Sequence, residues 1–182
     1  AVGLGWNIHH EKFMENTGIS RLKIRGSIGT TGKASFQPYQ SQTMFEYIQD
    51  GWYATGIGAT LMALGNPNLK WETNLNFNVG IDFSLFNNRF SGSFDFFTRR
   101  SKDLLYSRPI APSLGYGSID ENVGALKNTG IEMVLNGTII NQNGWVWKLG
   151  MNLTHYKNKV TELPLKDMPQ SGVNKLQVGR SV

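Results

Sequence analysis

The sequence contains no cysteine, and this absence excludes disulfide bonds, thiolate metal sites and a cysteine nucleophile. Charged residues are also scarce, at 17% of the 182 residues, against about 25% in a typical soluble domain. Aromatic residues make up 12%, which is too many for an intrinsically disordered chain. No stretch approaches the ~18 consecutive apolar residues that a membrane-spanning helix needs.

The surplus of positive charge is small and dispersed. Lysine and arginine number 18 against 13 aspartates and glutamates, which gives a formal net charge of +5. Because no block of about five or six like charges occurs, nucleic-acid binding is not expected. The chain begins without an initiator methionine or a signal-peptide pattern, so we expect it to be an excerpt of a longer polypeptide.

Alternation of apolar and polar residues is the main structural signal. Between residues 75 and 85 the odd positions are apolar, and the even positions are polar or glycine. Neighbouring side chains of a strand point to opposite faces, so the pattern predicts a strand over 71–86 with one apolar face. Two asparagines at 87–88 predict a tight turn, and a return strand over 89–98 then places apolar residues beside apolar residues.

A second hairpin is predicted around a turn at 141–144. The odd positions are mostly apolar over 129–139 and again over 145–153. Apolar residues on one face pair with each other, and here both apolar sets occupy odd positions. The connection between the strands must then hold an odd number of residues, and we expect three. A weaker strand pair is predicted over 4–8 and 21–28.

Short and long connections alternate along the chain. Short ones are expected near 14–20, 87–88 and 141–144, and long ones near 33–70, 106–125 and beyond 163. Bacterial outer-membrane barrels have this arrangement, with short periplasmic turns and long outer loops. The sequence therefore favours an all-β fold, in which antiparallel up-and-down strands form part of a large transmembrane β-barrel. The alternative is a soluble extracellular β-sandwich that binds glycans.

The two predicted faces differ chemically, as expected for lipid outside and water inside. The apolar face carries no charge in the regular stretches, and the charged residues of the opposite face are Arg21, Lys23, Arg25, Asp82, Asp95, Glu132 and Lys148. Aromatic residues gather near strand ends, where membrane proteins carry aromatic girdles. These are Phe86, Phe90, Trp145 and Trp147 by the short connections, and Tyr106 and Tyr156 by the long ones.

No catalytic constellation, metal site or cofactor motif is expected, and the sequence does not indicate an enzyme. His9 and His10 are neighbours on a predicted strand, so their rings should point to opposite faces. Asp82 and Asp95 are near-diagonal across the first hairpin, and we interpret them as wall charges with basic partners. The residues expected to face a barrel lumen are Arg25, Asp82, Asp95, Glu132 and Lys148. Aromatic rings stack on sugars, so the candidate substrate-binding residues are Trp52, Tyr53 and Tyr116 in the long loops.

Several ordered motifs resemble one receptor family. Residues 64–72, Leu-Gly-Asn-Pro-Asn-Leu-Lys-Trp-Glu, are similar to the Asn-Pro-x-Leu-x-x-Glu signature of TonB-dependent outer-membrane receptors, and the Lys-Trp-Glu form resembles their SusC/RagA branch in Bacteroidetes. Three further stretches fit that branch: 22–32, 122–132 and 158–163.

This resemblance implies a fold and a function. The family forms plugged barrels of roughly 22 strands, and its members import glycans or peptides across the outer membrane. TonB delivers the energy, and a SusD-like surface lipoprotein captures substrate. Residues 1–182 would then supply about six strands of the late barrel, with the N-terminal plug and the C-terminal strands absent. No cofactor is implied.

Overall fold

The computed structural model describes residues 1–15, 17–54, 56–163, 167–169 and 175–181. Within those ranges it contains ten strands and three short 3-10 helices. The strands are β1 (Val2–Asn7), β2 (Ile19–Lys33), β3 (Met44–Tyr53), β4 (Gly56–Ala63), β5 (Glu72–Leu85), β6 (Phe90–Pro109), β7 (Ser118–Gln142), β8 (Trp145–Glu162), β9 (Asp167–Pro169) and β10 (Lys175–Gln177). The 3-10 helices are η1 (Ile8–His10), η2 (Lys12–Met14) and η3 (Pro112–Leu114).

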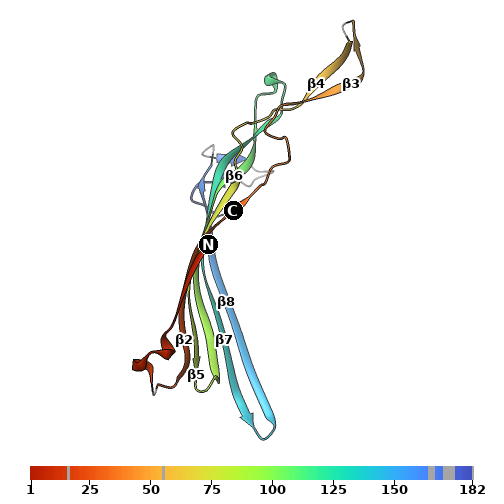
Figure 1. The fold of residues 1–182 in the computed structure, drawn as a ribbon. Coiled ribbons are helices and arrows are strands. Elements are labelled where there is room, and N and C mark those ends of the chain that lie inside the picture. The colour runs from red at the N-terminus through yellow and green to blue at the C-terminus, as the bar shows by residue number, and fades with distance from the viewer. Residues whose placement is uncertain (16, 55, 164–166, 170–174, 182) are drawn as a thin grey trace.

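One antiparallel sheet dominates the described part of the chain (Figure 1). Its six strands lie in the order β1-β2-β5-β6-β7-β8. Apart from the inserted β3 and β4, each strand therefore lies beside the strand that follows it along the chain. The hairpin β3-β4 is inserted between β2 and β5 and forms a separate two-stranded sheet, as do β9 and β10. This is the up-and-down arrangement that the sequence predicts.

The register places matching residues on each face across the sheet. One row runs from Ile24 through Ile81, Phe94 and Met133 to Leu153, and it belongs to what we call the apolar face. The adjacent row runs from Arg25 through Gly80, Asp95 and Glu132 to Thr154, and it belongs to what we call the polar face. Alternation in the sequence therefore becomes two faces of opposite chemistry.

The first predicted hairpin is confirmed. Strands β5 and β6 pair without a shift from Leu85↔Phe90 to Thr73↔Lys102. At the turn, Asn87 and Asn88 have φ of 52° and 65°, and the Arg89 amide donates to the Phe86 carbonyl at 3.1 Å. Asparagine tolerates these positive φ values better than most residues, which explains the tight turn.

The predicted three-residue connection of the second hairpin is wrong. Gln142 pairs with Trp145, so the turn holds only Asn143 and Gly144, whose φ values are 51° and 80°. Apolar residues still meet because the register shifts between Thr138 and Ile140. A β-bulge at Ile139 adds one residue to β7. With a two-residue turn, this extra residue is what lets the apolar positions of β7 and β8 remain opposite each other.

No second layer covers the apolar face in the part of the chain that the structure describes. Phe94 is 42% exposed, Met151 50% and Leu153 52%. Among the described residues, the only buried apolar side chains are those of Ile8, Ala125 and Val160. A β-sandwich would bury these side chains between two sheets, so the sandwich alternative is not supported.

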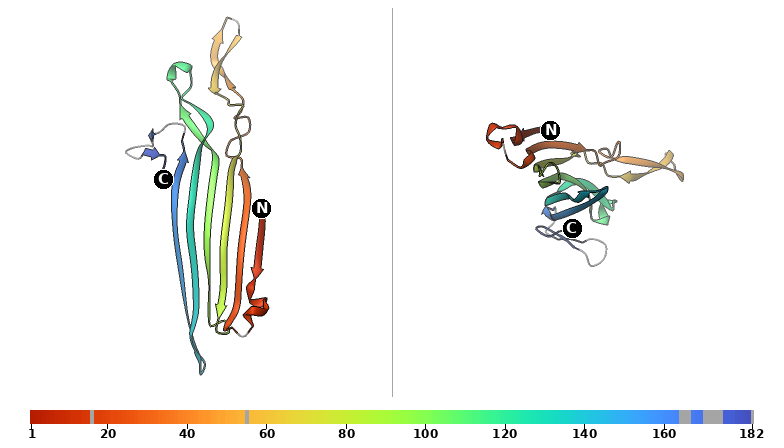
Figure 2. Two further views of the ribbon diagram at one scale, coloured as in Figure 1. Left: turned by 90° about the vertical axis from the view of Figure 1, so that its left-hand side faces the viewer. Right: turned by 90° about the horizontal axis from the view of Figure 1, so that it is seen from below.

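The connections lie at the two ends of the sheet (Figure 2). The segment 8–18 and the turns β5–β6 and β7–β8 lie at what we call the short-connection end, and the insertion 34–71 and the connection 110–117 lie at the long-connection end. The lengths follow the predicted alternation only in part, because the segment 8–18, predicted as a short connection over 14–20, holds η1 and η2 and is longer than the connection 110–117. The second long loop, predicted over 106–125, is shorter than expected. Strands β6 and β7 stay paired as far as Pro109↔Ser118, so much of that range is strand.

Among the described residues, no helix has the length and apolar character required to cross a membrane.

Candidate functional site

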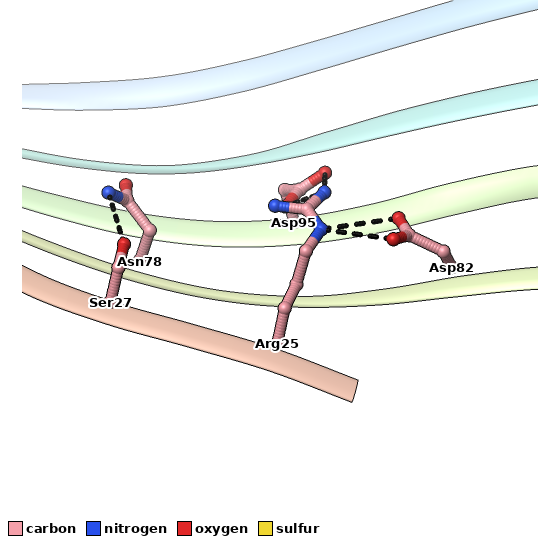
Figure 3. Close-up of polar contacts among 5 residues, drawn as sticks. All are labelled: Arg25, Ser27, Asn78, Asp82 and Asp95. Carbon is pink, nitrogen blue, oxygen red and sulfur yellow. Dashed lines mark hydrogen bonds and ion pairs between the residues drawn. The ribbon is translucent and has the colours of Figure 1, made fainter. Parts of the chain in front are cut away.

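Arg25 joins two carboxylates on the polar face (Figure 3). Its Nε lies 3.2 Å from Asp82 Oδ2, and its Nη2 lies 2.7 Å from Asp95 Oδ1. Arg25 comes from β2, Asp82 from β5 and Asp95 from β6, so the ion pairs tie three strands together. The side chains are only partly exposed, at 39% for Arg25, 23% for Asp82 and 21% for Asp95.

A missing side chain makes this bridge possible. Gly80 lies between Arg25 and Asp95 in the same cross-strand row and is buried. A methyl group added at Gly80 would overlap the Asp95 carboxylate and the Arg25 guanidinium. The glycine therefore lets the arginine reach across β5 to a carboxylate on the next strand but one.

The sequence pattern does not identify Arg25 as the partner of the two aspartates. The register of β5 and β6 follows from their tight turn, and that places Asp82 and Asp95 diagonally. The pairing of β2 with β5 spans the inserted hairpin, so neither turn length nor spacing predicts it. Once the register of β2 against β5 is known, the row Arg25-Gly80-Asp95 indicates the contact, because a glycine separates the cation from the carboxylate.

The other predicted wall charges lie on the same face. Glu132 pairs with Asp95 and Thr154 in register, and Lys148 pairs with Thr138 near the second turn. Neither forms an ion pair with another described residue. A shallow hollow lies above the row, and its lining includes Arg25, Asn76, Asn78, Asp95, Arg99, Asn128 and Glu132. This surface offers many hydrogen-bonding groups and both signs of charge to a polar solute.

The family-like motif around Asn66 attaches the insertion to the main sheet. Asn66 Nδ2 donates to the Asp120 carbonyl at 2.8 Å, and Asn66 Oδ1 accepts from the Asn68 amide at 3.0 Å. Asn122 accepts from the Lys70 amide at 2.7 Å and donates to the Lys70 carbonyl at 2.8 Å. Two motifs that are separate in the sequence therefore bind each other, and their role here is to anchor a loop.

Further contacts extend this anchor. The Leu105 amide donates to Glu72 Oε1 at 3.2 Å, and Asn122 Nδ2 also donates to the Asp103 carbonyl at 2.7 Å. The Gln40 amide group donates to the Asp120 carboxylate. The insertion 34–71 is thus held on β7 at both of its ends.

Arg108 and Glu121 form a pair near the far end of β6 and β7. Arg108 Nη2 lies 2.8 Å from Glu121 Oε1, and Nε lies 3.0 Å from Oε2, which is a two-point contact. The hydrogen bonds from Arg108 lower the pKa of Glu121 below its ordinary value of 4.5. The same hydrogen bonds raise the pKa of Arg108.

The candidate substrate residues fall in different parts of the outer segments. Trp52 and Tyr53 belong to β3, where their backbones pair with Ile57 and Gly56. Their side chains are not among those that the structure describes. Tyr116 lies in the connection 110–117 and is half-buried. Their role as substrate contacts stays a prediction.

Two details of the sequence interpretation are wrong. His9 and His10 are in the short helix η1, not on a strand, and their ring centroids lie 4.1 Å apart. Tyr156, expected in an aromatic girdle, pairs with Gly130 in the row of Asn78 and Phe97 on the polar face. Among the described residues, no group of three or more metal-ligating side chains is placed to hold an ion.

Comparison with known proteins identifies relatives along almost the whole chain. The model of the family described as TonB dependent receptor-like, beta-barrel, matches residues 1–179. TonB-dependent receptor P3 of Formosa agariphila is 35% identical over 167 residues, which cover 88% of this chain and 16% of that receptor. SusC of Bacteroides thetaiotaomicron is 29% identical over 170 residues, which cover 90% of this chain and 17% of SusC.

Solved structures agree with the sequence relatives. The structure of the RagAB peptide transporter matches with a TM-score of 0.85 at 29% identity, covering 98% of this chain and 20% of that one. The chain thus spans between 16% and 20% of the length of these relatives. The predicted all-β barrel class and the SusC/RagA resemblance are confirmed, and the family is one of receptors and not of enzymes. The chain belongs to the TonB-dependent receptor-like β-barrel family and is of the SusC/RagA type.

Proposed function

We propose that this chain is a wall segment of an outer-membrane importer. Its apolar face meets lipid, and its polar face looks into the barrel. The observation that carries the proposal is a single long-stranded sheet whose apolar face has no cover within the described residues. Membrane barrels alternate apolar residues outward and polar residues inward in this way, and closing the sheet satisfies the backbone at its edges.

Family membership supports a nutrient-import role for the intact protein. One relative is SusC, and one structural neighbour is a peptide transporter. We propose that the intact receptor takes up an oligosaccharide or a peptide, with a SusD-like lipoprotein as its surface partner and TonB as its source of energy. In this arrangement the long-connection end is the outer end, because outer-membrane barrels place long loops outside.

The predicted site residues have distinct roles in this proposal. Arg25, Asp82, Asp95, Glu132 and Lys148 line the interior wall, where the first three fix neighbouring strands to each other. Trp52, Tyr53 and Tyr116 belong to the two outer segments and would contact substrate through their ring faces.

Fractionation of the full-length parent receptor tests the location. The receptor is expected in the outer-membrane fraction, and detergent should be required to release it, since the apolar face is bound by hydrocarbon. Release by high salt alone would contradict the proposal, because salt weakens surface charge contacts but does not solubilise a barrel.

Uptake by whole cells tests the aromatic residues. The triple change Trp52→Ala, Tyr53→Ala and Tyr116→Ala is expected to reduce import of labelled oligosaccharide or peptide at equal receptor levels. The matched control is Phe13→Ala, because Phe13 is an exposed aromatic residue at the short-connection end. Equal uptake by the triple variant and the control would remove these aromatics from the substrate path.

A further inference from the structure

A row of basic residues borders the apolar face at its outer end. In register, Leu75 on β5 pairs with Arg100, Arg100 with Lys127, and Lys127 with Lys159. The next row towards the short turns runs from Phe77 through Thr98 and Thr129 to Lys157. Because Leu75 and Phe77 belong to the apolar face, these cations do too. We call Arg100, Lys127, Lys157 and Lys159 the basic border.

The cations of the basic border have no partner among the described residues. None of the ion pairs or side-chain hydrogen bonds found there includes any of the four, and Glu162 at the end of β8 does not pair with them. Arg100, Lys157 and Lys159 are exposed, and Lys127 is half-buried. Like charges on directly opposed residues repel each other, so an anion from outside the chain would stabilise this arrangement.

The distance of the border from the β5–β6 turn matches the thickness of a membrane. From Phe90 at the start of β6 to Arg100, the apolar-face positions are Phe90, Gly92, Phe94, Phe96, Thr98 and Arg100. A transmembrane strand needs about 9–11 residues to cross the hydrocarbon layer, which is the span from Phe90 to Arg100. The border therefore falls at head-group level on the side of the long connections.

We infer that the basic border binds the phosphate groups of anionic lipid in the outer leaflet. The inference rests on the proposed function, because it requires the apolar face to meet lipid. The aliphatic stems of lysine and arginine can lie along the apolar band while their charged ends reach the head groups. The guanidinium of Arg100 offers a two-point contact to phosphate, and the three ammonium groups add point charges around it. Acyl chains of the same lipid would pack on Phe77, Phe94 and Phe96.

Lipid retention by the full-length receptor tests this inference. The receptor is reconstituted into nanodiscs that contain either phosphatidylcholine alone or phosphatidylcholine with a minor fraction of lipid A, and the lipid that stays bound is measured by native mass spectrometry. The test variant is Arg100→Gln/Lys127→Gln/Lys159→Gln. The matched control is Arg21→Gln/Lys23→Gln/Arg99→Gln, which removes the same charge from the polar face.

The expected result is selective. Each basic residue at an anionic surface contributes enough that removing three should weaken lipid A binding on the order of 100-fold. The polar-face control should retain lipid A as the parent does, and an excess of inorganic phosphate should not displace it, because the acyl chains hold the lipid.

Three outcomes would overturn the inference while leaving the proposed function intact. These are equal retention of lipid A by the test variant and the control, no preference of the parent for lipid A, and full displacement by inorganic phosphate, which would mean that the border binds a free anion. Failure of the parent to insert into nanodiscs at all would instead contradict the proposed function, and the inference with it.

Discussion

At the residue scale, the bridge made by Arg25 shows how the polar face is stabilised. Two carboxylates on adjacent strands would repel each other without the guanidinium that lies between them. The pairs are partly exposed, so their contribution lies between that of a surface ion pair and that of a buried charged hydrogen bond. The arginine also needs the space that Gly80 leaves open.

The change Arg25→Met should destabilise the full-length receptor by about 1–2 kcal/mol, because Asp82 and Asp95 lose their shared partner. Chemical unfolding in detergent, followed by tryptophan fluorescence, measures the effect. The variant Arg25→Met/Asp82→Asn/Asp95→Asn serves as the control, since it has no unpaired carboxylates and should recover part of the loss. A single variant as stable as the parent would show that the bridge contributes nothing.

Acidification should loosen the Arg108–Glu121 contact. The folded-state pKa of Glu121 is below its ordinary value, so the contact stabilises the folded state above that value and is lost as the pH falls through the lowered pKa. The measurement is amide hydrogen exchange over 104–109 and 118–124, where β6 and β7 pair near this contact. The exchange rates of the parent and of Glu121→Gln, compared at matched pH, should differ at neutral pH and become equal in acid. A constant difference across the acid range would contradict this assignment.

At the element scale, the arrangement of the strands depends on bulges and an insertion that interrupt regular pairing. The bulge at Ile139 repairs the register after a two-residue turn, and further shifts between Ser101 and Leu105 occur where β6 leaves the regular sheet. The insertion 34–71 separates β2 from β5 along the chain, yet these two strands stay paired. Both parts of the insertion near the sheet are fixed to β7 by Asp120 and Asn122.

Asn122→Ala should release the C-terminal end of the insertion, near Lys70. The alanine removes one acceptor and the donors that satisfy the backbone of Lys70 and Asp103, so amide exchange over 66–72 should become faster while the short-turn end is unaffected. Asn68→Ala is the matched control, because Asn68 lies in the same motif and only its backbone amide is used among the contacts described. Equal exchange in the two variants would show that Asn122 is not the anchor.

At the scale of the whole molecule, the apolar face is the feature that decides where the protein belongs. Its large side chains, including Val79, Ile81 and Phe94, are more than a third exposed. An uncovered apolar surface of this extent in water marks an interface or an aggregation hazard. Lipid around a closed barrel removes both problems.

Val79→Arg should therefore cost about 2–4 kcal/mol if Val79 lies near the bilayer midplane. The measurement is the unfolding free energy of the full-length receptor in lipid vesicles. Asn78→Arg is the matched control, because Asn78 precedes Val79 and lies on the polar face near Arg25. Equal stability of Val79→Arg and the parent would mean that Val79 does not face lipid.

The strands of the first hairpin, their register and the chemistry of the two faces can be predicted from the sequence alone. Those features depend on local alternation and on a tight turn, which are written in neighbouring residues. The other features depend on the tertiary structure. It placed Arg25 between two aspartates across an insertion, joined the motifs around Asn66 and Asn122, and collected four cations into one border. Each of these depends on pairing between strands that are distant in the chain or on a bulge that shifts the register, and neither has a local signature in the sequence.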